Sequence, residues 1–132
     1  MEIYGIGTDI IEVERIKYTI KRNSGFLKRV YTENEINYCE RKKRNKYQSL
    51  AARFAAKEAV AKSLTEGIGK NVSLKEIELL NMDSGAPFIK LHGKTFEFSK
   101  NLKIKDIKIS VSATENFAIA CAVAIIWFIN KQ

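Results

Sequence analysis

The chain has 132 residues, of which 45% are hydrophobic and 29% charged, and its formal net charge is +8 at pH 7. These values exclude a disordered chain and predict a single domain over residues 1–132, with a basic surface suited to nucleic acid, a membrane surface, an acidic protein or a polyphosphate. Two cysteines without CxxC spacing and one histidine argue against a zinc site. Early acids argue against a signal peptide, and residues 117–129 are fewer than the about 20 of a membrane helix, so we expect a cytoplasmic protein that does not enter membranes.

The N-terminal residues predict a strand followed by a helix. Residues 2–9 are short, apolar and glycine-containing, so we expect Asp9 at the carboxyl end of a strand, where binding residues are often found. From Ile10 onward, the spacing of apolar residues predicts a helix with Ile10 and Val13 turned toward the core.

Two short helical segments lead to a long central helix. Residues 26–30 predict one helical turn, and Thr32 with Glu35 has the spacing of a capping box at the start of the next helix. The basic run at residues 41–46 is interpreted as solvated charge. A proline-free, alanine-rich run over residues 47–64 predicts the central helix, which ends before a pair of glycines.

The central helix carries one carboxylate among several cations. Glu58 and Lys62 are four residues apart and share a helix face, a pattern that is also typical of an ordinary surface ion pair. Small side chains recur at helical spacing and predict a narrow face that lets another backbone come close: Ala52, Ala56, Ala59 and Ser63.

The second half of the chain predicts two hairpins separated by a helix. Residues 77–80 and 88–91 flank a turn-rich segment, and residues 93–100 predict a helix with Phe96 turned inward. Two long paired strands are expected over residues 107–112 and 117–128. A strand, then helices, then hairpins indicates an α+β domain, with a small antiparallel sheet packed on the long central helix.

The charged residues at these positions suggest chemistry at a phosphate. Asp9 and Glu58 are candidate ligands, because Mg²⁺ is commonly held by two carboxylates together with phosphate oxygens and waters. Arg53, Lys57 and Lys62 would neutralise a polyphosphate around such a metal ion. Neither a GxxxxGK[ST] loop nor a GxGxxG loop is present, which excludes the two common nucleotide-binding loops.

Five sequence blocks stand in order along the chain. They are Ile6 to Ile10 with Arg15, Phe26 to Glu35, Arg53 to Lys62 with Gly67-Ile68-Gly69, Ile77 to Asn81 with Gly85-Ala86-Pro87, and Ser110-Val111-Ser112. Together they resemble the motifs of the 4'-phosphopantetheinyl transferase family, and in particular of holo-[acyl-carrier-protein] synthases, over nearly the whole chain. One K-E-A-x-x-K block alone would be weak, but five blocks at matching spacing are specific.

The resemblance implies an activity and the residues that perform it. Such enzymes use coenzyme A and Mg²⁺, transfer the phosphopantetheine arm to a serine of apo-acyl carrier protein for fatty acid biosynthesis, and release adenosine 3',5'-bisphosphate. Asp9 and Glu58 match the metal-binding acids, and both are expected to be catalytic together with Lys62. The residues expected to contact coenzyme A are Arg53, Lys62, Gly69, Ser110 and Ser112. Glu58 or a metal-bound water would accept the serine proton, and the water is favoured because a carboxylate on Mg²⁺ is a poor base.

The resemblance also implies protein partners. Acyl carrier proteins are acidic, so a positive surface would attract them. The residues that match the docking region are Arg15, Lys21, Arg22 and Lys28, which without the resemblance would be interpreted as an exposed helix face. Bacterial members of the family are trimers with sites between subunits, and the apolar run over residues 117–128 fits either such an interface or a core strand.

One position departs from the family pattern. The family usually has histidine directly after the S-x-S motif, where this chain has Ala113; Thr114 is a possible substitute, and His92 is interpreted as structural. Two alternatives stay open. One is a homologue of weak activity that only binds coenzyme A. The other is a basic nucleic-acid-binding module, against which we set the absence of an aromatic RNA-binding signature and the core-like positions of Phe54, Phe88, Phe96 and Phe117.

Overall fold

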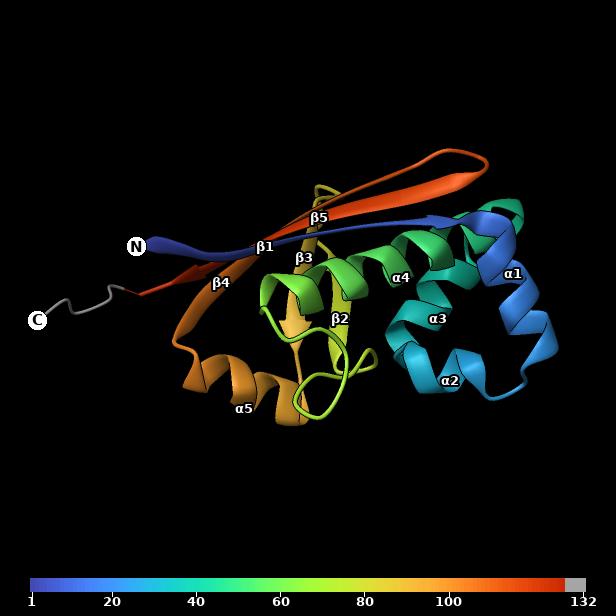
Figure 1. The fold of residues 1–132 in the computed structure, drawn as a ribbon. Coiled ribbons are helices and arrows are strands. Elements are labelled where there is room, and N and C mark those ends of the chain that lie inside the picture. The colour runs from blue at the N-terminus through green and yellow to red at the C-terminus, as the bar shows by residue number, and fades with distance from the viewer. Residues whose placement is uncertain (128–132) are drawn as a thin grey trace, which may run out of the picture.

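The computed structural model describes residues 1–127. In chain order the elements are β1 (Glu2–Glu12), α1 (Val13–Arg22), α2 (Phe26–Val30), α3 (Glu33–Glu40), the 3₁₀ turn η1 (Lys43–Asn45), α4 (Lys46–Ser63), β2 (Ile77–Asn81), β3 (Pro87–Leu91), α5 (Gly93–Asn101), β4 (Ile104–Ala113) and β5 (Phe117–Ile126) (Figure 1). Residue 128, the predicted end of the last strand, lies outside the described residues.

A three-stranded antiparallel sheet lies against α4. The strand order is β1-β5-β4, and β2 and β3 form a separate hairpin. In Figure 1, α4 runs along one face of the sheet, with α1, α2 and α3 gathered at one end and α5 at the other. The prediction of an α+β fold, with a small antiparallel sheet packed on a long central helix, is confirmed.

The sheet and α4 approach each other closely because both present small residues. Every second residue of β5 from Ala118 to Ala124 is a buried alanine. On β1, a Cβ added to Gly7 would run into the carbonyl oxygen of Ala59, and one added to Gly5 would run into that of Ser63. The predicted narrow face of α4 is therefore in contact with the backbone of β1.

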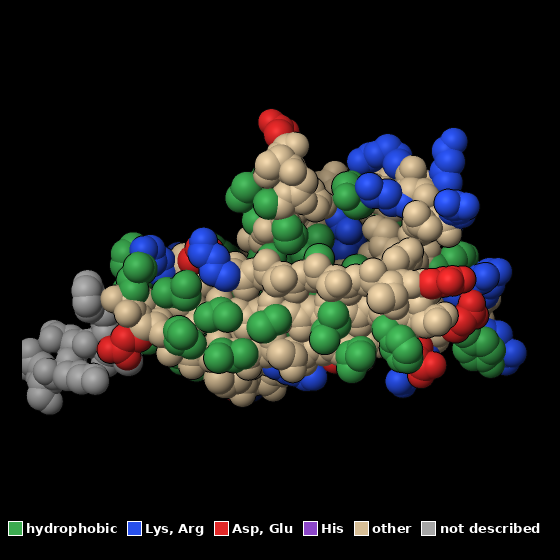
Figure 2. Space-filling model, turned by 90° about the horizontal axis from the view of Figure 1, so that it is seen from above, with side chains coloured by type: hydrophobic (Ala, Val, Ile, Leu, Met, Phe, Trp, Pro, Cys, Tyr) green, Lys and Arg blue, Asp and Glu red, His purple; other side chains and the backbone are tan. Residues whose placement is uncertain are grey.

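The other face of the sheet is apolar and exposed. Side chains alternate across a strand, so the residues between the buried alanines point away from α4. Ile6 and Ile10 of β1 are 61% and 63% exposed, and Phe117 and Ile119 of β5 are each 48% exposed. We call this surface the outer face of the sheet; Figure 2 shows hydrophobic side chains spread along it. An apolar surface of this kind is typical of an interface.

A buried ion pair anchors α4 to its other neighbours. The Lys57 ammonium is fully buried and donates hydrogen bonds to Glu35 Oε1 (2.7 Å) and to the carbonyl oxygens of Leu74 (3.0 Å) and Ile77 (2.5 Å). Glu35 also accepts from the backbone N–H of Leu79. Burial lowers the pKa of Lys57, and Glu35 opposes this effect. Lys57 is therefore a structural cation that ties α4 to α3 and β2, and its prediction as a phosphate contact is wrong.

The first predicted helix begins too early. Ile10 and Ile11 pair with Ile119 and Ala118, so β1 continues to Glu12 and α1 starts at Val13. The helical spacing of Ile10 and Val13 is overridden by the hydrogen bonds of the β1–β5 ladder. Ile10 consequently lies on the outer face of the sheet instead of in a helix core.

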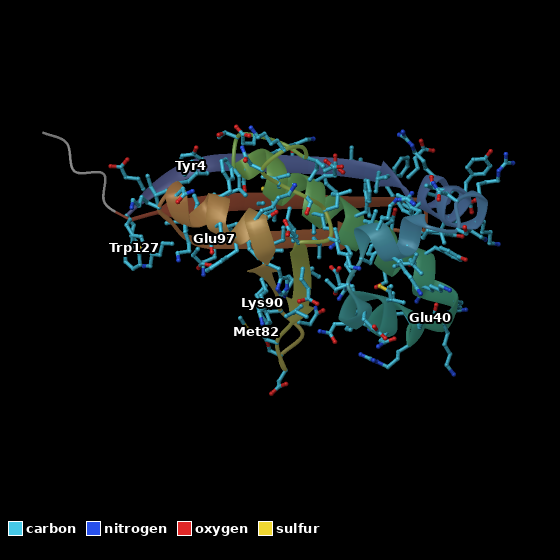
Figure 3. All side chains as sticks on the ribbon, turned by 90° about the horizontal axis from the view of Figure 1, so that it is seen from below. Tyr4, Glu40, Met82, Lys90, Glu97 and Trp127 are labelled. Carbon is cyan, nitrogen blue, oxygen red and sulfur yellow. The ribbon has the colours of Figure 1, made fainter. Side chains whose placement is uncertain are left out.

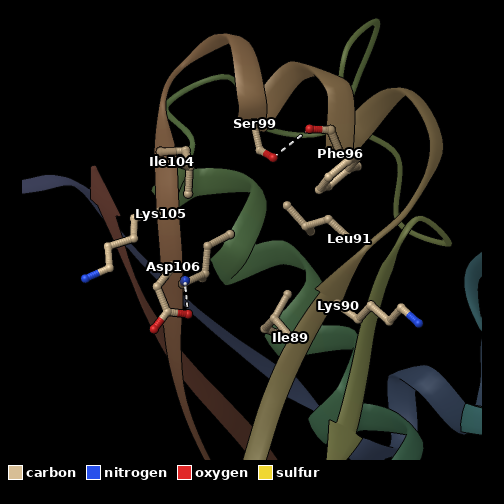
Figure 4. A pocket seen from close by; sticks show the side chains of 9 residues that line it. Ile89, Lys90, Leu91, Phe96, Ser99, Ile104, Lys105 and Asp106 are labelled. Carbon is tan, nitrogen blue, oxygen red and sulfur yellow. Dashed lines mark hydrogen bonds between the residues drawn. The ribbon is translucent and has the colours of Figure 1, made fainter. Parts of the chain in front are cut away.

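Two aromatic residues predicted in the core are partly exposed. Phe117 lies on the outer face of the sheet, and Phe96 is 44% exposed because α5 buries Thr95 and Ser99 instead. Phe96 borders a pocket of about 410 Å³ between β3, α5 and β4. In Figure 4, Phe96 points into this pocket together with Leu91, while Lys90 points away. No predicted site residue lines it.

Candidate active site

Asp9 and Glu58 line one cavity. It measures about 370 Å³ and lies between the end of β1, helix α1 and the middle of α4. Its other lining residues are Ile10, Ile11, Arg15, Ile16, Thr19, Phe26 and Phe54. One side of the cavity is thus acidic, and the phenylalanines form an apolar wall with ring centroids 6.2 Å apart.

The close packing of β1 on α4 brings the two carboxylates together. Asp9 is two residues after Gly7 and therefore points to the same face of the sheet, toward α4. Glu58 directly precedes Ala59, whose carbonyl oxygen is the atom that leaves no room for a Cβ on Gly7. Partial burial raises the pKa of Glu58, the Asp9 carboxylate raises it further, and the Lys62 ammonium acts in the opposite direction. The two acids are therefore electrostatically coupled.

Lys62 completes this cluster. Its ammonium donates to the carbonyl oxygen of Thr8 (2.9 Å) and to Asp9 Oδ1 (3.3 Å), and the Lys62 side chain is 52% exposed. Among the ion pairs of residues 1–127, Lys62 pairs with Asp9 and not with Glu58. The interpretation of Glu58 and Lys62 as an ordinary surface pair is therefore wrong.

The donor set fits a metal ion that shares its ligands with a substrate. Within residues 1–127, no three His, Cys, Asp or Glu side chains are grouped so that they could hold a metal ion by themselves. Asp9 and Glu58 offer carboxylate oxygens in one partly exposed cavity. Mg²⁺ is usually bound by one or two carboxylates together with substrate phosphates and waters, so these two residues suit it.

Arg53 lies elsewhere on α4 and is almost fully engaged. Only 5% of the residue is exposed, its Nη2 donates to Asn81 Oδ1 (2.8 Å), its Nη1 donates to Ser49 Oγ (3.4 Å), and the guanidinium lies 4.1 Å from the centroid of the Tyr38 ring. Within the described chain, its buried Nε has no hydrogen-bond partner.

Arg53 lines a second cavity of about 440 Å³, together with Asn34, Asn37 and Arg41. This cavity lies between α3, whose end is marked by Glu40 in Figure 3, and the hairpin marked by Met82. The structure does not bring Arg53 to Asp9 and Glu58.

Three further predicted contacts with coenzyme A are also separate from the acidic cavity. Ser110 and Ser112 pair with Cys121 and Ile119 and are exposed on the outer face of the sheet. Asp9 points to the opposite face, so the sheet lies between it and the two serines. Gly69 is in the loop after α4, where its N–H donates to the carbonyl oxygen of Val72.

Comparison with known proteins identifies the family. Residues 5–122 match the family described as the 4'-phosphopantetheinyl transferase superfamily. The chain belongs to this superfamily. A relative in Ruminiclostridium cellulolyticum, named holo-[acyl-carrier-protein] synthase, is 52% identical over 120 residues that cover 89% of each chain. Both the resemblance found in the sequence and the prediction of a phosphopantetheinyl transferase enzyme are thereby confirmed.

Solved structures of this transferase superfamily share the fold. The holo-[acyl-carrier-protein] synthase of Neisseria meningitidis superposes with a TM-score of 0.87 at 32% identity and covers 94% of this chain and 99% of its own. The Helicobacter pylori enzyme, solved in complex with coenzyme A, gives 0.80 at 36% identity and covers 91% and 99%. The core-like positions predicted for four phenylalanines no longer argue against a nucleic-acid-binding module, because Phe96 and Phe117 are exposed. Membership of the transferase superfamily is the argument against that alternative.

The surface beside the acidic cavity of this transferase is basic. Arg15 lines the cavity, and all four predicted docking residues are exposed: Arg15, Lys21 and Arg22 on α1 and Lys28 on α2. Phe26 and Phe54, which wall the cavity, had no functional role in the sequence-based prediction. The position of Phe54 between Arg53 and Ala55 in the central block is the signal that could have indicated a role for it.

No helix among residues 1–127 is both long and apolar enough to cross a membrane.

The position where the family usually has histidine lies at a strand end. Ala113 is the last residue of β4, and Thr114 follows in the turn. The Thr114 hydroxyl accepts from the N–H of Phe117 (3.1 Å) and lies 3.4 Å from the Phe117 carbonyl oxygen. It is engaged in closing the turn, so Thr114 does not present a free donor in place of the histidine. His92 bonds to Glu78 (2.9 Å), as expected of a structural residue.

Proposed function

We propose that this transferase moves the 4'-phosphopantetheine arm of coenzyme A to a serine hydroxyl of apo-acyl carrier protein. A bond forms between the serine oxygen and the phosphorus of the arm, and the bond to the 5'-phosphate breaks, which releases adenosine 3',5'-bisphosphate. The observation that carries this proposal is the convergence of Asp9, Glu58 and Lys62, from β1 and α4, beside a basic surface. The names of the relatives support the same activity. We propose fatty acid biosynthesis as the process that the modified carrier serves.

The residues of the acidic cavity have complementary roles in this proposal. Asp9 and Glu58 would hold Mg²⁺, which would supply positive charge beside the pyrophosphate and the leaving phosphate. Lys62 offsets the remaining negative charge of the departing bisphosphate. Glu58 is the side chain in this cavity that would receive the serine proton by way of a water molecule, since a carboxylate that also binds Mg²⁺ is a poor direct base. Phe26 and Phe54 exclude water from one side.

Coenzyme A would extend beyond the acidic cavity. In our proposal, Arg53 contacts one of its phosphates from the second cavity, where Arg41 adds positive charge. Gly69, Ser110 and Ser112 are the other proposed contacts. Since the sheet separates the serines from Asp9 within one subunit, we propose a homotrimer in which neighbouring subunits complete the site. The apolar outer face of the sheet supports such an assembly.

The carrier protein would dock beside the acidic cavity. Carrier proteins of this type are acidic, and Arg15, Lys21, Arg22 and Lys28 are exposed on the two helices that border the opening. Opposite charges accelerate encounter and orient the partner. Arg15 would meet the segment of the carrier that bears the serine, because it also lines the cavity.

A mass measurement tests the proposed function. Purified protein is incubated with coenzyme A, Mg²⁺ and apo-acyl carrier protein, and the carrier should gain the mass of one phosphopantetheine. If the carrier keeps its mass while the protein still binds coenzyme A in a titration, the second candidate, a homologue that only binds coenzyme A, is correct. Ala113 is the observation that favours this second candidate.

A further inference from the structure

Asp9 already has a cationic partner in the protein alone. The Lys62 ammonium lies 3.3 Å from Asp9 Oδ1 and is held near it by the carbonyl oxygen of Thr8 at 2.9 Å. Glu58 is four residues before Lys62 on α4, so the same ammonium lies on the helix face of the second carboxylate. One positive charge therefore partly neutralises the two acids on which a divalent cation would have to bind.

This arrangement is unfavourable to a metal ion that arrives alone. A divalent cation bound to Asp9 would add two positive charges beside the Lys62 ammonium. Like charges a few ångströms apart repel each other, and the repulsion is stronger where water is partly excluded. The ammonium is able to move away because the Lys62 side chain is 52% exposed and lysine has a flexible four-carbon stem. When it leaves, however, it loses the carboxylate as an acceptor. A phosphate group in the cavity would offer it a new one.

We propose that Asp9 exchanges Lys62 for the metal ion, and that this exchange makes the binding of the metal depend on the phosphates of the substrate. It rests on the proposed metal site at Asp9 and Glu58. In the protein alone, Lys62 occupies Asp9 and weakens metal binding. When the metal enters together with a polyphosphate, Lys62 turns from Asp9 to the phosphate oxygens. Since coupling between two ligands is reciprocal, the metal must strengthen coenzyme A binding by the factor by which coenzyme A strengthens metal binding.

Binding of Mn²⁺, measured by electron paramagnetic resonance with and without coenzyme A, tests this exchange. Without coenzyme A, Lys62→Gln should bind Mn²⁺ about fivefold more tightly than the wild type, or more, in the usual range of such couplings. The factor by which coenzyme A strengthens Mn²⁺ binding should fall in the same variant. Lys62→Arg keeps the positive charge and should restore weak binding of the metal alone.

The matched control is Lys75→Gln, which removes the same charge at an exposed loop position. It should leave Mn²⁺ affinity unchanged, and circular dichroism should show that every variant is folded. If Lys62→Gln binds Mn²⁺ no more tightly than the wild type, while Asp9→Asn abolishes binding, the exchange is refuted and the metal site stands. If the wild type binds no Mn²⁺ with or without coenzyme A, the metal site and the exchange both fail.

Discussion

Two lysines five residues apart on α4 have opposite environments. Lys57 is fully buried and bonds to Glu35 and to two carbonyl oxygens, whereas the Lys62 side chain is 52% exposed and pairs with Asp9. Five residues correspond to about 140° around a helix, which turns the first lysine into the protein and the second toward Asp9 and solvent. Only Lys62 is therefore available to a substrate phosphate.

At the same scale, the two carboxylates should be indispensable for transfer but not for folding. Glu58→Gln and Asp9→Asn are each expected to lower the transfer rate by about 10²-fold or more, because each removes a carboxylate charge that, in our proposal, binds the metal ion or helps to accept the serine proton. The rate is measured by the mass gain of the carrier. Thermal unfolding should stay near that of the wild type, since neither side chain is in the hydrophobic core.

The control for these variants is Glu97→Gln, an exposed carboxylate on α5 outside the acidic cavity. Its transfer rate should equal that of the wild type. Near-wild-type rates for both Glu58→Gln and Asp9→Asn would show that the metal has other ligands.

At the scale of elements, the contact between β1 and α4 sets the distance between the two acids. Gly7→Ala should destabilise the fold by about 1–3 kcal/mol, as overpacking usually does, because the new Cβ would meet the carbonyl oxygen of Ala59. Pushing β1 from α4 should also lower transfer activity by separating Asp9 from Glu58. Chemical denaturation of Gly7→Ala checks the first effect. Gly69→Ala, where a Cβ would meet nothing within 4 Å and φ is not positive, should leave stability unchanged.

The Glu76 carboxylate caps the start of α5, so the stability of the protein should depend on pH. Glu76 Oε1 accepts from the backbone N–H (3.1 Å) and hydroxyl (2.7 Å) of Thr95, and Oε2 accepts from the N–H of Lys94 (3.2 Å). Desolvation acts to raise the pKa of Glu76, but these bonds and one from Ser73 outweigh it, so the pKa is lowered. Since the folded pKa lies below the unfolded one, the cap stabilises at neutral pH and loses its effect as the pH falls through the folded value.

Glu76→Gln should therefore cost about 1 kcal/mol at pH 7, the usual value of a helix cap, and much less in acid. Unfolding by urea at pH 7 and at pH 3 measures the difference. A cost that stays constant with pH would mean that the charge of Glu76 contributes nothing. Glu97→Gln is again the control, and its effect should be close to zero at both pH values.

The sequence predicted elements with a strong local signal better than it predicted their boundaries and environments. The alanine-rich run of α4, the capping box at Thr32 and the turn-rich β2–β3 hairpin were found because their signals are local. The extension of β1 through Ile10 was missed because it depends on pairing with β5, more than 100 residues away. For the same reason, no local pattern showed that Lys57 is buried or that Phe96 is exposed.

Only part of the site could be predicted from the sequence. Some of its residues belong to recognisable sequence blocks, whereas other features depend on contacts between β1 and α4. Asp9 and Glu58 were found together since both belong to specific sequence blocks, and the structure places them in one cavity. The pairing of Lys62 with Asp9 depends on the packing of β1 on α4, which sequence spacing does not contain. Arg53, Ser110 and Ser112 stay predicted contacts, because within one subunit they do not lie beside Asp9 and Glu58.

At the scale of the whole molecule, the outer face of the sheet decides whether the chain works alone. Ile119 lies on the middle strand of this face, is 48% exposed and stands opposite Ile10 and Ser112 on the two neighbouring strands. Ile119→Asp should therefore convert the proposed trimer to a monomer, because a buried unpaired carboxylate is too unfavourable for an interface to retain. Light scattering coupled to size exclusion gives the molecular mass.

The same variant should lose most of its transfer activity although Asp9, Glu58 and Lys62 are untouched, since the serines of a neighbouring subunit would no longer reach the acidic cavity. Met82→Asp places the same charge on an exposed hydrophobic residue of the hairpin loop, away from the outer face, and should keep the mass of the wild type. A wild-type protein that is monomeric and fully active would contradict the shared site, and it would require Arg53, Ser110 and Ser112 to be removed from the proposed coenzyme A contacts. An Ile119→Asp monomer with full activity would contradict it in the same way, because the trimer would then have no part in catalysis.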